Sequence, residues 1–172
     1  MSSQRLTMTS AVDAAIRIHG QQTYPHECCG ALVGRDGFVT AVVALPNTTD
    51  EGPRRRFMVR PSDYQLAERR ATELGGELLG FYHSHPDHPA RPSQYDLDHA
   101  WPTFAYIIVA VNGRLAREGG EAAAVESRRS SEAAKAGPMT VWYLLEDRSR
   151  FEEGSLNHGE NSHPDTAPTV HG

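Results

Sequence analysis

Hydrophobic and polar positions along the chain follow two periods, one typical of helices and one typical of strands. Apolar residues recur at helical spacing over residues 10–19, a stretch that Gly20 is expected to end. A second helical pattern begins with a capping box formed by Ser62 and Gln65, and it stops at Gly75. The first half of the chain therefore predicts two helices separated by strand-like sequence.

Strand-like runs, rich in β-branched and aromatic residues, make up much of the remaining sequence. The runs Gly30–Arg35 and Phe38–Leu45 flank Asp36-Gly37, the strongest short signal for a hairpin. The continuous apolar run Ala105–Val111 predicts a central strand that is covered on both faces. Further strands are expected at Phe57–Val59, Leu78–His83 and Met139–Leu145.

The alternation of strands and helices predicts one α/β domain over residues 1–153. Two segments depart from this pattern. Residues 117–138 contain almost no apolar side chains, so we expect a solvated insertion there. Residues 154–172 are polar and have no periodicity, which predicts a disordered C-terminal tail.

Composition and charge narrow the classes of function. Hydrophobic residues make up 38% and charged residues 23% of the 172 residues, as in ordinary globular domains. A net charge of -5 gives no reason to expect a nucleic acid or an anionic membrane as partner. Residues 1–10 lack a secretory pattern, and the adjacent Cys28 and Cys29 have no other cysteine to pair with. We therefore expect a cytoplasmic protein.

The segment from His83 to Asp96 gathers residue types that bind a catalytic metal. Side chains at i and i+2 of an extended segment point the same way, so His83 and His85 can direct two imidazoles at one point. Asp96 falls on the first turn of a helix that is expected from Ser93 to about Ala100. Two imidazoles and one carboxylate, with a fourth position left to water, are typical of a catalytic zinc site.

Each part of this pattern also has a simpler interpretation. Ser93 and Asp96 form a helix-start pattern, in which the serine side chain caps the helix and the aspartate side chain bonds back to the serine backbone. A His-x-His pair on a strand can be an ordinary polar pair, and His99 on the same helix is an alternative ligand. The metal-site hypothesis rests on the conjunction of a strand end, two histidines, a turn-rich loop, a serine and an aspartate.

The arrangement His-Ser-His, seven residues, Ser, two residues, Asp resembles the complete signature of the JAMM (MPN+) metallopeptidases. The stretch Pro25–Gly34 resembles the small bacterial branch of that family, which includes the CysO-cysteine peptidase. The resemblance implies a single MPN domain with a mixed central sheet flanked by helices, similar to cytidine deaminases. It also implies that one zinc ion per chain is held by His83, His85 and Asp96.

The same resemblance implies roles for two further residues, with Glu27 as general base and Ser93 as the group that steadies the oxyanion. The implied reaction is hydrolysis of a peptide or isopeptide bond after the C-terminal Gly-Gly of a ubiquitin-like sulfur-carrier protein. A deubiquitinase-like isopeptidase acting on another ubiquitin-like partner and a non-catalytic MPN scaffold are the alternatives. Ser84 is interpreted as structural, and Cys28 and Cys29 as small buried thiols rather than nucleophiles. The oligomeric state stays open, with a homodimer as one alternative.

Overall fold

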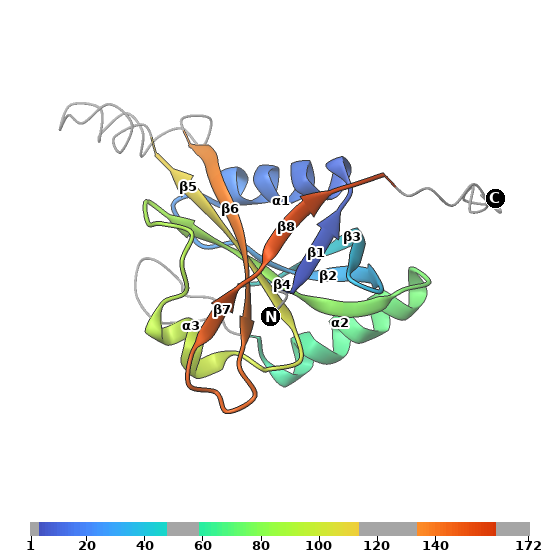
Figure 1. The fold of residues 1–172 in the computed structure, drawn as a ribbon. Coiled ribbons are helices and arrows are strands. Elements are labelled where there is room, and N and C mark those ends of the chain that lie inside the picture. Colours follow the sequence, from blue (N-terminus) through green and yellow to red (C-terminus); the bar gives the residue numbers. More distant parts are fainter. Residues whose placement is uncertain (1–3, 48–58, 114–133, 161–172) are drawn as a thin grey trace, which may run out of the picture.

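The structure, a computed structural model, describes residues 4–47, 59–113 and 134–160. These residues form one eight-stranded sheet with helices on both faces (Figure 1). In chain order the elements are β1 (Arg5–Met8), α1 (Ser10–Thr23), β2 (Cys29–Arg35), β3 (Phe38–Leu45), α2 (Pro61–Glu73), β4 (Glu77–Pro86), α3 (Gln94–His99), β5 (Ala105–Asn112), β6 (Lys135–Leu144), β7 (Phe151–Glu153) and β8 (Ser155–His158).

The sheet is mixed, and its strands lie in the order β7-β6-β5-β4-β2-β3-β1-β8. Strand β1 runs parallel to both β3 and β8, and β4 runs parallel to β5. The remaining neighbours are antiparallel. Strand β4 therefore lies inside the sheet, between β2 and β5. The predicted mixed sheet flanked by helices is confirmed.

Helix α1 covers one face of the sheet, and α2 and α3 lie on the other (Figure 1). Successive side chains of a strand point to opposite faces. On β4, Tyr82 points to the α1 face, where its hydroxyl lies 2.8 Å from His19 Nδ1. Phe81 points to the other face and contacts Phe104 at a ring distance of 5.4 Å. His83 and His85 share the face of Phe81 because they follow it at even spacing.

The first helix is longer than its sequence pattern predicted. The Thr9 hydroxyl caps α1 by accepting a hydrogen bond from the Val12 N–H, and the helix continues past Gly20 to Thr23. Gly20 is buried, and a Cβ atom at this position would lie only 2.9 Å from a methyl carbon of Val111. The prediction that Gly20 ends the helix is wrong, because this glycine allows α1 to pack closely against β5.

The start of the second helix also differs from the prediction. Pro61 occupies the first position of α2, and the Asp63 carboxylate accepts a hydrogen bond from the Arg60 N–H at 3.3 Å. The expected capping box of Ser62 and Gln65 is therefore wrong, since the N-cap is Arg60 and the helix begins two residues earlier. The expected stop is confirmed, because Gly75 has a φ of +74°, a left-handed conformation that favours glycine.

The strand predictions hold best where the signal is local. Asp36 and Gly37 form the predicted hairpin turn, with φ values of 50° and 74°. Strand β4 runs beyond His83 to Pro86, so both histidines belong to it. Strand β6 begins at Lys135, which corrects the end of the insertion expected over 117–138. The rest of that insertion, residues 117–133, and most of the strand expected at 57–59 lie outside the described residues.

The C-terminal boundary predicted at residue 153 is also wrong. Residues 155–158 form β8, which pairs in parallel with β1 from Arg5↔Ser155 to Met8↔His158. His158 Nε2 lies 2.7 Å from an Asp13 carboxylate oxygen on α1, so the side chain of His158 contacts the first helix. The ordered domain therefore extends through β8, and the part of the expected tail at 161–172 lies outside the described residues.

No helix in the described parts of the chain is long and apolar enough to cross a membrane.

Candidate metal centre

Three side chains predicted as metal ligands come together at the C-terminal end of β4. His83 and His85 are buried, and their Nε2 atoms lie 3.1 Å apart. Helix α3 places Asp96 across from them, with Oδ1 3.3 Å from His83 Nε2 and Oδ2 3.2 Å from His85 Nε2. Among the described residues, only this group of three or more His, Cys, Asp or Glu side chains is close enough to hold a metal ion.

The spacing of these atoms fits a tetrahedral zinc ion. Zinc binds nitrogen and oxygen ligands at about 2.0–2.1 Å, so two ligands of a tetrahedron lie about 3.3 Å apart. The two imidazole nitrogens lie 3.1 Å apart, and each lies 3.2–3.3 Å from a different oxygen of Asp96, distances that are close to this value. A set of two imidazoles and one carboxylate also matches the three-ligand catalytic class, in which the fourth position is taken by water or substrate.

The hydrogen bonding of His85 presents the correct nitrogen to a metal. His85 Nδ1 lies 2.9 Å from the Pro89 carbonyl oxygen. A carbonyl can only accept, so Nδ1 carries the hydrogen, and the neutral ring has its lone pair on Nε2. Such a backbone carbonyl behind a metal-binding histidine fixes the tautomer and the orientation of the ring.

Asp96 is held in place by the start of α3. The Ser93 hydroxyl accepts a hydrogen bond from the Asp96 N–H at 3.1 Å, and Asp96 Oδ2 accepts one from the Ser93 N–H at 2.8 Å. The capping-box interpretation of these two residues is thus confirmed together with the convergence of Asp96 on the histidines. The Ser93 hydroxyl acts as acceptor in this bond, so its own hydrogen can be donated to a substrate oxygen.

Electrostatics favour an ionised carboxylate beside the imidazoles. Burial alone would raise the pKa of Asp96, but His83, His85 and the Ser93 N–H outweigh it and hold this pKa well below its usual range. Burial would likewise lower the pKa of His83, but the charges of Asp96 and Glu27 outweigh it and raise this pKa. The Asp96 carboxylate is therefore ionised at neutral pH, the form that binds a metal ion.

Glu27 lies in the segment that leads into β2. Cys29, two positions later, is the first residue of β2 and pairs with His83 on β4, and the Ser84 N–H donates to the carbonyl oxygen of Cys28, so this segment runs beside the end of β4 that carries the histidines. The effect of its charge on His83 agrees with this placement. The Glu27 carbonyl oxygen accepts a hydrogen bond from Asn47 Nδ2 at 2.9 Å, which fixes the backbone at this point.

Ser84, Cys28 and Cys29 lie next to the proposed site residues in the sequence and are buried in the core. Ser84 is fully buried, and its hydroxyl accepts a hydrogen bond from the Cys28 N–H at 2.8 Å, in agreement with its structural interpretation. Cys28 and Cys29 are each 1% exposed. Burial raises the pKa of Cys28 to about 11 and also raises that of Cys29. The prediction of small buried thiols is confirmed by this burial, and a raised pKa disfavours the thiolate that a nucleophile requires.

The alternative ligand His99 is not part of the cluster. It is exposed, its ring stacks on Tyr95 at 4.1 Å, and its Nδ1 atom lies 2.8 Å from the Tyr95 carbonyl oxygen. Sequence reasoning therefore found all three members of the cluster. It did not find the carbonyl of Pro89, because no side-chain signal marks a backbone acceptor.

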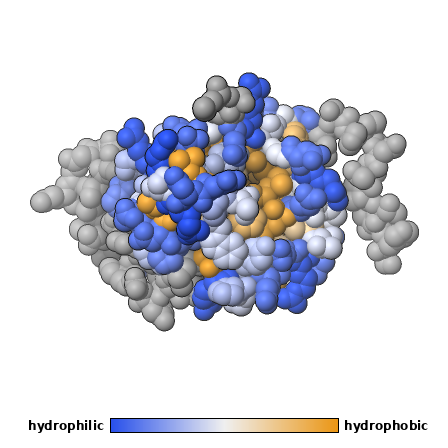
Figure 2. Space-filling view, turned by 60° about the horizontal axis from the view of Figure 1, so that its bottom comes forward, coloured by the Kyte–Doolittle hydropathy of each residue, from blue (hydrophilic) through white to orange (hydrophobic). Residues whose placement is uncertain are grey.

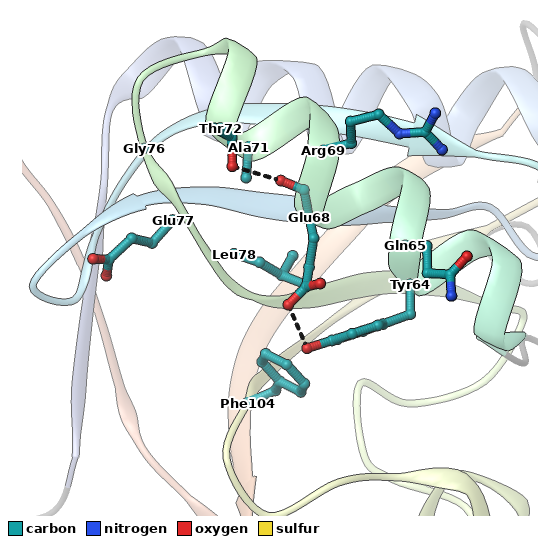
Figure 3. A pocket seen from close by; sticks show the side chains of 10 residues that line it. All are labelled: Tyr64, Gln65, Glu68, Arg69, Ala71, Thr72, Gly76, Glu77, Leu78 and Phe104. Carbon is teal, nitrogen blue, oxygen red and sulfur yellow. Dashed lines mark hydrogen bonds between the residues drawn. The ribbon is translucent and has the colours of Figure 1, made fainter.

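A separate pocket of about 870 Å³ lies between α2 and the start of β4, and its lining contains no histidine or cysteine. Within it, the Tyr64 hydroxyl donates to a Glu68 carboxylate oxygen at 2.7 Å (Figure 3). Leu78, which lines the pocket, lies near the start of β4, whereas His85 lies near its end, so this pocket is not the site of the metal chemistry.

On the face brought forward in Figure 2, hydrophobic side chains reach the surface in patches among polar ones.

Comparison with known proteins shows the family of this chain. The profile described as "Prokaryotic homologs of the JAB domain" matches residues 9–128. The chain belongs to this prokaryotic JAB family. The matched stretch contains Glu27, Ser93 and all three members of the cluster. The resemblance to the JAMM (MPN+) peptidases is thereby confirmed, and the chain is a hydrolase of that type.

Individual relatives agree with membership of the JAB family. A desampylase of Haloferax volcanii is 31% identical over 122 residues, which cover 67% of this chain and 87% of the relative. A protein of Thermus thermophilus named "probable TtuB-protein conjugate cleaving protease" is 34% identical over 97 residues, or 56% of this chain and 64% of that protein. The solution structure of a Salinibacter ruber protein is 34% identical, covers 92% of this chain and 95% of its own, and superposes with a TM-score of 0.63.

Proposed function

We propose that this JAB-family protein is a zinc-dependent peptidase or isopeptidase that cleaves after the C-terminal Gly-Gly of a ubiquitin-like protein. The observation that carries the proposal is the cluster of His83, His85 and Asp96, whose mutual distances suit one tetrahedral zinc ion. The charge of Glu27 raises the pKa of His83, so a carboxylate that is not needed as a ligand lies near the cluster. The names of the two relatives support a protein conjugate as substrate.

A zinc ion held by the three ligands would lower the pKa of a coordinated water to about 7 and polarise the scissile carbonyl. The residues of the chain then divide the remaining tasks. Glu27 takes a proton from the attacking water and delivers it to the departing amine. The Ser93 hydroxyl donates a hydrogen bond to the developing oxyanion, a contact worth about 3 kcal/mol where it has been measured. No side chain forms a covalent bond to the substrate.

The sheet supports recognition of an extended C-terminal tail. Among the described residues, β3 pairs with β1 only at Phe38 and Val39. The rest of β3 runs toward Leu45. Leu45 pairs with Cys29 on β2, and Cys29 pairs with His83 on β4, so this end of β3 lies two strands from the histidine. An extended peptide can add to such an edge through backbone hydrogen bonds. A ubiquitin-like sulfur carrier that ends in Gly-Gly is the substrate that we infer within this class.

The proposal is tested with two kinds of substrate, a sulfur-carrier protein extended beyond its Gly-Gly and the same carrier joined to a lysine by an isopeptide bond. We expect cleavage directly after the second glycine, loss of cleavage in the presence of a chelator, and recovery when zinc is restored. If zinc-loaded protein binds these carriers and leaves every bond intact, the non-catalytic scaffold is the correct interpretation instead.

A further inference from the structure

A hydrogen bond between Tyr24 and Asp87 connects the segment that contains Glu27 to the loop that follows His85. Tyr24 precedes Glu27 by three positions, and Asp87 follows His85 by two. The Tyr24 hydroxyl donates a hydrogen bond to Asp87 Oδ2 at 2.6 Å. A hydrogen bond to a charged acceptor is stronger than one between neutral groups. This contact therefore links the segment of the proposed base directly to the loop of the proposed ligands.

Asp87 is itself a fixed point at the end of the sheet. Its Oδ1 atom accepts a hydrogen bond from the Gly113 N–H at 2.8 Å, and its own N–H donates to the Val111 carbonyl oxygen at 2.8 Å. Its φ of 57° is a left-handed conformation that residues other than glycine seldom adopt. The loop after His85 is thus anchored to the end of β5, and Tyr24 is bonded to that anchor.

Gly113 makes room for this arrangement. A Cβ atom at position 113 would overlap the Tyr24 hydroxyl. The φ of Gly113 does not lie in the left-handed region, so the backbone here does not require glycine. Close approach of Tyr24 to Asp87 is the physical reason for a glycine at this position.

Glu27 lies between two attachments to the strand that carries the histidines. On one side, Tyr24 is bonded to Asp87, just beyond the end of β4. On the other side, the Cys28 N–H donates to the hydroxyl of Ser84, which stands between His83 and His85. A short segment fixed at both ends holds the residue between them at a set distance from the ligands.

We propose that Tyr24 and Asp87 are positioning residues that set the place of the Glu27 carboxylate relative to His83, His85 and Asp96. This inference rests on the proposed hydrolytic function. Neither side chain belongs to the ligand cluster, so removal of the Tyr24 hydroxyl alone should leave the three ligands in place. Misplacement of a reacting group by about 1 Å can cost about 100-fold in rate.

The decisive variant is Tyr24→Phe, which removes the hydroxyl and keeps the ring. We expect kcat on a carrier fusion to fall at least about tenfold, with KM and zinc content unchanged. Gly113→Ala should produce the same loss, because it displaces the Tyr24 hydroxyl without removing it. The matched control is Tyr82→Phe, since the hydroxyl of this buried tyrosine bonds to His19 on α1, on the opposite face of the sheet. Its kcat should equal that of the wild type.

A second readout does not depend on activity. Hydrogen–deuterium exchange of a peptide covering residues 24–28 should be faster in Tyr24→Phe and Gly113→Ala than in the wild type or Tyr82→Phe. Wild-type kcat in Tyr24→Phe, a kcat loss that merely follows loss of zinc, or unchanged exchange of residues 24–28 would each overturn the positioning role. If the wild type itself cleaves nothing, the proposed function fails, and the exchange experiment still decides whether Tyr24 fixes this segment.

Discussion

At the scale of single residues, Asp96 combines two functions in one carboxylate. Its Oδ2 atom accepts the hydrogen bond from the Ser93 N–H that starts α3, and the same atom lies 3.2 Å from His85 Nε2. The helix cap therefore fixes the direction of the carboxylate before any metal binds. Helix capping and metal binding compete as interpretations of the sequence, but the geometry of Asp96 is compatible with both.

Substitution of Glu27 and of His85 should separate the base from the ligands. We expect Glu27→Gln to keep its zinc and to lose at least about 100-fold in turnover, because the amide cannot accept the proton from water. His85→Ala should lose both zinc and turnover, since only two ligands remain. Elemental analysis and cleavage assays on the same preparations measure both quantities.

The control for these variants is Glu77→Gln, which removes an exposed carboxylate at the start of β4 and should behave as the wild type. A Glu27→Gln protein with wild-type turnover would show that another group acts as the base.

At the scale of elements, local signals in the sequence predicted what lies within one strand or helix. The hairpin at Asp36-Gly37, the buried strand β5 and the helix after Ser93 each depend on neighbours in the sequence, and each was predicted. Strand β8 is four residues long and polar in part, and it is stabilised by pairing with β1 at the other end of the chain. No pattern within residues 155–158 could show that contact.

The same limit applies to the site. The spacing of His83, His85 and Asp96 predicts their cluster because one strand, one loop and one short helix bring them together. Glu27 directly precedes the part of the chain that pairs with β4, and only the family resemblance indicated its role. Tyr24 and Asp87 left no signal at all, since a hydrogen bond between two distant loops has no period or spacing.

The packing of α1 on β5 is tested by Gly20→Val. The added atoms would meet Val111, whose methyl carbon would lie 2.9 Å from the new Cβ. We expect the free energy of unfolding to fall by about 1–3 kcal/mol, as for other overpacked sites. Urea unfolding measures it, and Ala14→Val at an exposed position of α1 controls for the helix propensity of valine. Equal effects of the two substitutions would contradict close packing at Gly20.

At the scale of the whole molecule, Asp13 connects three parts of the fold. Its carboxylate lies 2.7 Å from Arg17 Nε in α1 and 2.7 Å from His158 Nε2 in β8. Arg17 in turn donates to the Gly137 carbonyl oxygen in β6 at 2.6 Å. The C-terminal strand is thus tied to the first helix as well as to β1, which explains why the domain continues beyond residue 153.

This connection should make part of the stability depend on pH. Burial would raise the pKa of Asp13, but hydrogen bonds from Arg17 and His158 outweigh it and hold this pKa below its ordinary value. A lowered folded-state pKa gives stability above the unfolded pKa of about 3.9, and this stability is lost as the pH falls through the folded pKa. Asp13→Asn should therefore lower the free energy of unfolding by about 1 kcal/mol at pH 7.

Urea unfolding of the wild type and Asp13→Asn at several pH values measures this difference. It should shrink as the pH falls below about 4, where the wild-type carboxyl also becomes protonated. Loss of metal in acid affects both proteins equally and cancels in the comparison. A difference that stays constant from pH 7 to strongly acidic pH would contradict the role of the Asp13 charge.

The proposed chemistry requires that His83, His85 and Asp96 hold a single zinc ion. Elemental analysis of protein purified without chelators tests it most directly. We predict one zinc ion per chain in the wild type and in Glu27→Gln, and none in His85→Ala. Wild-type protein that contains no zinc and takes up none from solution would contradict the account.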